Sequence, residues 1–267
     1  MIYRLAIVFI FTLTIHLIGT LAYSVRLVAV KTGRIAVSFA LFNILVLVSR
    51  TANAFQAPLL AKVVERDIPN ADIAHPCYIF NLLILAASIG TLLGAFLIPT
   101  FQGLLAKLVE KFSVKRSLPR LLLHSFTKSG VKQVRDNFRI PAKGNVHHFR
   151  NLKQAPVKLI VLNGLIVGVL TVGSFAALYA ALLNPDSRLT ISTLVPIITG
   201  VAAIILVTCI DPFLSLLTDD CLEGKVSQGF FHKCVVLMVA SRFAGTLLAQ
   251  LLLIPAAHVI VTISRII

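Results

Sequence analysis

Charged side chains are scarce in this sequence. Only 13% of its 267 residues are Asp, Glu, Lys or Arg, 58% are hydrophobic, and the mean hydropathy is +0.94. Soluble domains carry about 25% charged and about 45–50% apolar residues. A water-soluble core cannot absorb this excess of apolar side chains, so the composition excludes an ordinary soluble domain and indicates a membrane protein.

The residue patterns of metal, disulfide and nucleotide sites are also missing. The sequence has four cysteines without CxxC or metal-ligand spacing: Cys77, Cys209, Cys221 and Cys234. His147 and His148 are adjacent, but no further ligand follows them at metal spacing. No GxxxxGKS/T motif could cradle nucleotide phosphates. The sequence therefore predicts no metal site, no cofactor and no direct use of ATP.

What the sequence has instead is a series of long apolar runs. A spanning helix needs about 20 mostly apolar residues. Six runs reach that length, at about 2–23, 34–57, 79–101, 158–183, 192–217 and 231–263, the last interrupted by Pro255. The sequence predicts an all-α, polytopic membrane protein with about six transmembrane helices.

Two of these runs share a short similarity. GTLLGAFLIP at 90–99 resembles GTLLAQLLLIP at 245–255, with one residue inserted. Three-helix repeats necessarily run in opposite senses, as in the inverted architecture of many transporters. The similarity suggests a 3+3 inverted repeat, with chance similarity between leucine-rich segments as the alternative. We predict a first membrane unit at 1–101, a basic loop at 102–157 and a second membrane unit at 158–267.

Positive charge is concentrated in the central loop. Between residues 102 and 158 lie thirteen Lys or Arg residues against Glu110 and Asp136, a net charge of +11. Lys and Arg close to spanning helices resist translocation, so this loop is expected in the cytoplasm. Both chain ends and the loops at 58–78 and 184–191 are then expected outside.

The start of the basic loop has an amphipathic pattern. Residues 103–112, GLLAKLVEKF, place apolar side chains on one helical face and Lys107, Glu110 and Lys111 on the other. Interfacial helices have this pattern, and a basic surface binds anionic lipids. We expect the loop to orient the protein and adhere to anionic membrane lipids; recognition of a phosphorylated headgroup or of a protein is the alternative. Nucleic-acid binding is not expected, because the loop contains no known binding module.

Arg50 continues an apolar run. If its helix enters the membrane near Ile35, Arg50 lies about 22 Å along the axis and Gln56 about 31 Å, in a hydrocarbon core about 30 Å thick. Arg50, Asn53 and Gln56 are spaced by three residues and share one helical face. They form a polar stripe along a path for a substrate, unless the helix ends early and Arg50 reaches the outer headgroups.

Other polar groups interrupt the apolar runs. His16 lies in the middle of the first run, and Asp211 precedes Pro212, which removes a backbone donor. Asp211 could pair with Arg50 or Arg242, or take up a proton; His16 could relay a proton or simply bond to a neighbour. Arg26, Lys31 and Arg34 are expected at the inner interface, either reaching for headgroups or forming a phosphate entrance.

The first quarter of the chain resembles a known family. The stretch 13–62 contains YSVRLVAVKTGR at 23–34 and LVSRTANAFQAP at 47–58, and it is similar to the alternative lipid II flippases typified by Amj. The resemblance continues more loosely through LILAASIGTLLGAFLIPT, LNGLIVGVLTVGSFAALYAALLNP and IDPFLSLLTDD. It implies a multi-pass protein of the bacterial inner membrane that moves the undecaprenyl-pyrophosphate-linked cell-wall precursor, lipid II, to the outer leaflet.

The resemblance supplies no set of functional residues, so we assign them on physical grounds. The expected substrate path comprises Arg26, Lys31, Arg34, Arg50, Asn53, Gln56 and Arg242, with His16 and Asp211 as groups that take up a proton or form an ion pair. Six helices are few for so large a headgroup, which makes a homodimer plausible.

Two other function classes are open at this point. One is a membrane enzyme acting on undecaprenyl lipids, although the densest acidic cluster, at 219–223, has no recognisable acid/base or metal pattern and no catalytic residue is predicted. The other is a scaffold of the envelope machinery that transports nothing.

Overall fold

The computed structural model describes residues 2–67, 74–115, 138–139, 141 and 155–267. Within these ranges the chain is helical and no strand occurs. The helices are α1 (Ile2–Thr32), α2 (Ile35–Asp67), α3 (Ala74–Lys115), α7 (Val157–Leu183), η2 (Pro185–Ser187), α8 (Arg188–Ile205), η3 (Leu206–Ile210), α9 (Asp211–Leu222) and α10 (Gln228–Ile266). Because α8, η3 and α9 follow one another without a break, the described residues contain six helical stretches long and apolar enough to cross a membrane. The all-α, six-helix prediction is confirmed.

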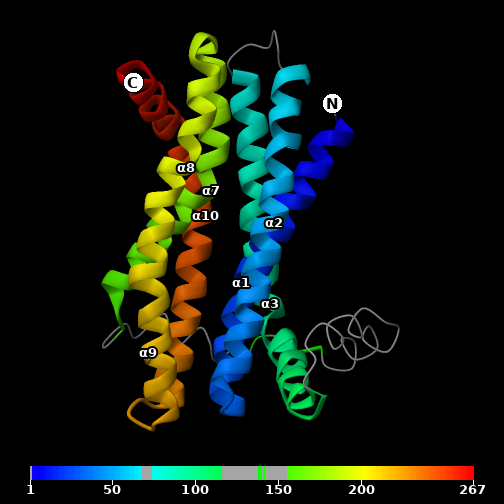
Figure 1. Cartoon of the computed structure of the whole chain (residues 1–267), viewed down its shortest axis with the longest axis vertical. Coiled ribbons are helices and arrows are strands. Elements are labelled where there is room, and N and C mark those ends of the chain that lie inside the picture. Colours follow the sequence, from blue (N-terminus) through cyan, green and yellow to red (C-terminus); the bar gives the residue numbers. More distant parts are fainter. Residues whose placement is uncertain (1, 68–73, 116–137, 140, 142–154) are drawn as a thin grey trace.

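The helices form two three-helix units that stand side by side (Figure 1). The first unit comprises α1, α2 and α3; the second comprises α7, the α8–α9 stretch and α10. Successive helices are antiparallel, so both chain ends lie at the same end of the molecule, which we call the terminal end (Figure 1). Gly33 and Gly224, both with positive φ, turn the chain at the opposite end, where Ser227 caps α10 by accepting a hydrogen bond from the Phe230 amide.

Within each unit the first and third helices cross closely at a glycine. A side chain on Gly90 of α3 would meet the Leu13 carbonyl of α1, and one on Gly245 of α10 would meet the Gly164 carbonyl of α7. Small residues allow such backbone approach between membrane helices. Gly90 and Gly245 begin the two similar segments, and α1 and α7 run in opposite directions (Figure 1). These features agree with an inverted arrangement, although the repeat itself stays a prediction.

The core joins the two units near the terminal end. Phe80 of α3 packs against Phe175 and Tyr179 of α7, with ring centroids 6.3 and 6.1 Å apart. Buried Thr hydroxyls bond to their own helix four residues back, as Thr12, Thr91 and Thr171 do, so they add no unsatisfied group. Large apolar side chains remain exposed on the outside, as expected for a lipid-facing surface.

Helix α3 extends beyond residue 101, the end that the sequence predicts for the third spanning segment. Helix α3 continues past Pro99 to Lys115, so the amphipathic segment 103–112 is the end of a spanning helix and not a separate one. Its Leu105, Ala106 and Val109 are buried against Val25 and Val28 of α1, because this apolar face meets protein. Most of the basic loop, at 116–137 and 142–154, lies outside the described residues.

Candidate functional site

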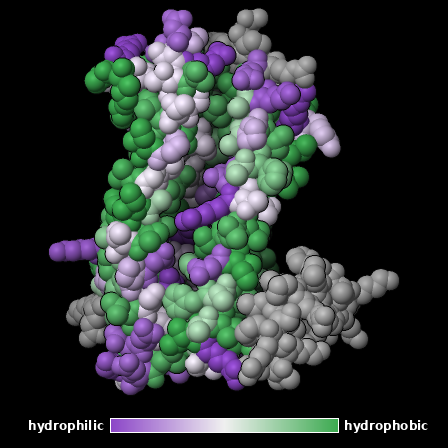
Figure 2. Space-filling view, in the orientation of Figure 1, coloured by the Kyte–Doolittle hydropathy of each residue, from purple (hydrophilic) through white to green (hydrophobic). Residues whose placement is uncertain are grey.

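A polar strip runs along the line between the two units. In the space-filling view, hydrophilic residues gather at mid-height where the surface is hollowed between α2 and the α8–α9 stretch (Figure 2). Apolar side chains cover much of the surface on either side. We call this hollow the central groove.

Arg50 belongs to the α2 side of this groove. It is exposed, lies near the middle of a 33-residue helix and interacts electrostatically with Asp211 of the second unit. The alternative that the helix ends shortly after Arg50 is wrong, because α2 continues to Asp67. Asn53, one turn further, is exposed as well.

Gln56 lies on a different side of α2. It is 5% exposed, and its amide nitrogen donates to the Thr12 hydroxyl of α1. Ser49 donates similarly to the Ile15 carbonyl, at 3.3 Å. The predicted stripe is therefore divided: Arg50 and Asn53 are exposed, whereas Gln56 attaches α2 to α1.

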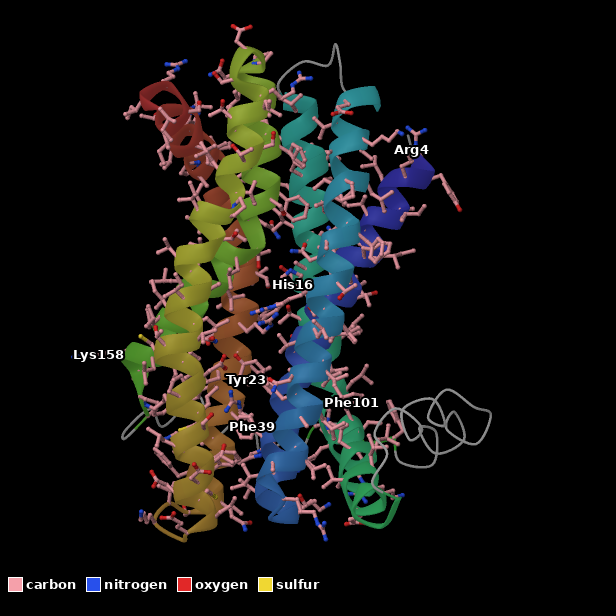
Figure 3. All side chains as sticks on the ribbon, in the orientation of Figure 1. Arg4, His16, Tyr23, Phe39, Phe101 and Lys158 are labelled. Atoms are coloured by element: carbon pink, nitrogen blue, oxygen red, sulfur yellow. The ribbon has the colours of Figure 1, made fainter. Side chains whose placement is uncertain are left out.

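Arg26 and Asp211 connect the two units below mid-height. The Arg26 Nη2 atom lies 2.9 Å from Asp211 Oδ1, and Nη1 donates to Ser215 Oγ at 3.2 Å. The guanidinium also lies over the rings of Phe39 and Phe42 of α2, 5.5 and 5.2 Å from their centroids. Phe39 is labelled in Figure 3, between α2 and the second unit.

Two sequence interpretations change here. Arg26 was expected at the inner interface but is 3% exposed, because it packs between α2 and α9. Asp211 pairs with Arg26 and not with the Arg50 or Arg242 suggested by the sequence. A π-helical turn, Leu206–Ile210, directly precedes Asp211, and such turns are frequent at functional sites.

Lys31 and Arg34 lie near the turn at Gly33. Both side chains are exposed, at the end of the molecule opposite the chain termini. They do not belong to the mid-height part of the groove.

His16 and Arg242 belong to a polar layer inside the molecule. The Tyr23 hydroxyl lies 3.4 Å from Asn163 Oδ1 of α7, and Asn163 Nδ2 donates to Ser241 Oγ of α10 at 2.8 Å. Arg242 makes a side-chain hydrogen bond to Tyr23 and interacts electrostatically with His16. His16 and Tyr23 are labelled in Figure 3, between the two units. The layer joins α1, α7 and α10.

Sequence reasoning missed part of this layer. Tyr23 and Asn163 were not singled out, although Tyr23 lies seven residues after His16, on the same helical face, and Asn163 interrupts a long apolar run. Those two signals could have identified them. Within the described ranges no group of His, Cys, Asp and Glu is arranged to hold a metal ion.

The chain is similar to known proteins over nearly its whole length. The family model described as Amj, "Alternate to MurJ", matches residues 11–264. The chain is 36% identical over 259 residues to the lipid II flippase Amj of Bacillus subtilis (strain 168), covering 97% of this chain and 96% of that protein. No solved structure matches significantly.

Proposed function

The chain belongs to the Amj family, and from this premise we propose that it is a lipid II flippase. It moves the undecaprenyl-pyrophosphate-linked peptidoglycan precursor from the cytoplasmic to the outer leaflet of the bacterial inner membrane, for cell-wall synthesis. Six spanning stretches make it a multi-pass membrane protein. Its activity is transport, so no catalytic residue is needed.

The central groove is the observation that supports this function best. Moving lipid II requires a polar route for a charged headgroup beside an apolar surface for its isoprenoid tail. The groove offers Arg50 of α2, which interacts with Asp211 of the second unit, and Asn53 is exposed one turn further along α2. Apolar side chains such as Leu47 and Phe55 are exposed on the same helix. Arginine suits such a route because its planar fork binds phosphate oxygens in two bonds and stays ionised.

The remaining predicted residues receive distinct roles in this proposal. Lys31 and Arg34 form the cytoplasmic approach to the groove, and the Arg26–Asp211 pair closes its lower part until a headgroup enters. The basic segment 102–157 contacts anionic lipids, and two copies of the chain share the bulky headgroup as a homodimer. Outward movement of an anion gains about 2.3 kcal/mol per charge per 100 mV of inside-negative potential, which supplies a driving force without ATP.

The test is lipid II in the outer leaflet of cells whose other flippases are depleted. Wild-type chain should restore it, and Arg50→Ala at matched membrane abundance should reduce the rate about tenfold or more, since a hydrogen bond to a charged group contributes about 1.5–3 kcal/mol. Arg265→Ala, on an exposed residue at the end of α10, is the matched control and should be active. No rescue by wild type would contradict the flippase function; full rescue by Arg50→Ala would keep the function and remove Arg50 from the route.

A further inference from the structure

Among the described residues, the polar layer between the units contains two buried nitrogen atoms without hydrogen-bond partners. They are Arg242 Nε of α10 and His16 Nδ1 of α1. The two side chains belong to different units, but they interact electrostatically and therefore lie in the same region of the molecule. Buried polar atoms are nearly always satisfied, and each exception requires an explanation.

The guanidinium of Arg242 lies against α1. His16, Gly19 and Tyr23 share one face of α1, being three and four residues apart. A side chain on Gly19 would collide with Arg242 Nη2, so the glycine leaves the space that the guanidinium occupies. Tyr23 holds the guanidinium by a hydrogen bond and is itself held by Asn163.

In the part of the chain that the structure describes, no carboxylate compensates the positive charge of Arg242. Among the described residues no Asp or Glu lies within salt-bridge distance of it, and Asp211 is paired with Arg26. An unpaired cation at membrane depth is costly and usually marks a functional site.

We propose that Arg242 and His16 form an anion-binding site between the two three-helix units and that this site binds pyrophosphate groups. This proposal rests on the proposed flippase function. In that function the site holds the pyrophosphate of the lipid-linked substrate midway across the membrane. The pyrophosphate is bonded directly to the isoprenoid, so it is the charged part of the headgroup nearest the hydrocarbon. Arg242 Nε donates toward such an oxygen, and so does the neutral His16 imidazole in the tautomer that carries its proton on Nδ1.

Binding to the purified full-length chain in neutral phosphatidylcholine nanodiscs tests the site. The probes are undecaprenyl pyrophosphate, inorganic pyrophosphate and undecaprenol, which lacks phosphate. Wild-type chain should bind the pyrophosphate lipid at least tenfold more tightly than undecaprenol, and Arg242→Gln should lose that difference. Arg265→Gln, at the exposed end of the same helix, should bind like the wild type.

Gly19→Ala tests whether binding depends on the position of the Arg242 guanidinium or only on its positive charge. It retains Arg242 but forces the flexible end of that side chain to move, so binding should weaken while the melting temperature changes little. Arg242-dependent binding of either pyrophosphate probe supports the site, and the probe that binds identifies lipid or free anion as its source. Binding of neither probe by the wild type, or unchanged binding by Arg242→Gln, overturns it.

The flipping assay separates failure of this site from failure of the proposed function. If wild-type chain restores outer-leaflet lipid II and Arg242→Gln does so equally, the anion site is wrong while the flippase function stands. If the wild-type chain does not restore outer-leaflet lipid II, the proposed flippase function itself is wrong.

Discussion

At the residue scale, the Arg26–Asp211 pair combines a buried cation with a partly exposed anion. The Arg26 side chain is 4% exposed and that of Asp211 33%. Removing the carboxylate leaves the buried guanidinium beside Ser215 and two aromatic rings, which carry no compensating negative charge. The cost of an uncompensated buried charge then exceeds the value of the ion pair itself.

Asp211→Ala should therefore lower the free energy of unfolding by about 2–3 kcal/mol, below the about 3–5 kcal/mol of fully buried pairs because Asp211 is partly solvated. Thermal unfolding in detergent measures this effect. The double variant Arg26→Met with Asp211→Leu should regain much of the lost stability.

The control is a surface pair. Lys225 lies 2.5 Å from Glu223, and both side chains are more than half exposed. Glu223→Gln should leave the melting temperature nearly unchanged, since exposed ion pairs contribute about 0–1 kcal/mol. Equal effects from Asp211→Ala and Glu223→Gln would show that Arg26 does not depend on its carboxylate.

At the element scale, two glycine crossings hold the helices of each unit together. A side chain on Gly90 or Gly245 would meet a backbone carbonyl, which cannot move aside as the end of a side chain can. Gly103, in contrast, has nothing within 4 Å of the corresponding position, although it lies on the same α3 helix as Gly90. The three positions differ in packing and not in residue type.

Gly90→Ala and Gly245→Ala should each destabilise the protein by about 1–3 kcal/mol through overpacking. Gly103→Ala should be neutral or slightly stabilising, because alanine favours a helix over glycine by about 1 kcal/mol. Melting temperatures of the three purified variants check this ordering. A neutral Gly90→Ala would mean that α1 and α3 cross less closely than described.

At the scale of the whole molecule, the arrangement of the helix ends makes the orientation testable. The chain termini and the turn at Pro185–Ser187 lie at one end, and the turn around Gly224 lies at the other (Figure 1). The positive-inside rule assigns the end that adjoins the basic segment to the cytoplasm. The turn at Gly224 is acidic overall, because Asp219, Asp220 and Glu223 accompany Lys225.

Single cysteines at Asp186 and Lys225, in a chain whose four native cysteines are replaced, should label from opposite sides of the membrane. A membrane-impermeant maleimide added to intact spheroplasts should react with the cysteine at 186 and not with that at 225. Lysed membranes should label both and serve as the control. Reaction at 225 in intact spheroplasts would reverse the proposed orientation.

The sequence by itself determined the class of the protein and its spans. Long apolar runs can only satisfy their backbone groups in a membrane as helices, so composition and run length sufficed for six spans. The family was also readable from local motifs in the first quarter of the chain. The sequence also predicts that Arg50 lies at membrane depth, because helix rise converts residue number directly into distance.

Only the tertiary structure decided which polar side chains meet. Arg26 and Asp211 are 185 residues apart, and their pairing depends on the way α9 packs beside α1. The same packing separates Gln56 from Asn53 and buries the apolar face of 103–112 against α1. It also leaves Arg242 without a carboxylate partner among the described residues. Helical period fixes the face on which a side chain lies, but the partner of that face is chosen by contacts between helices distant in sequence.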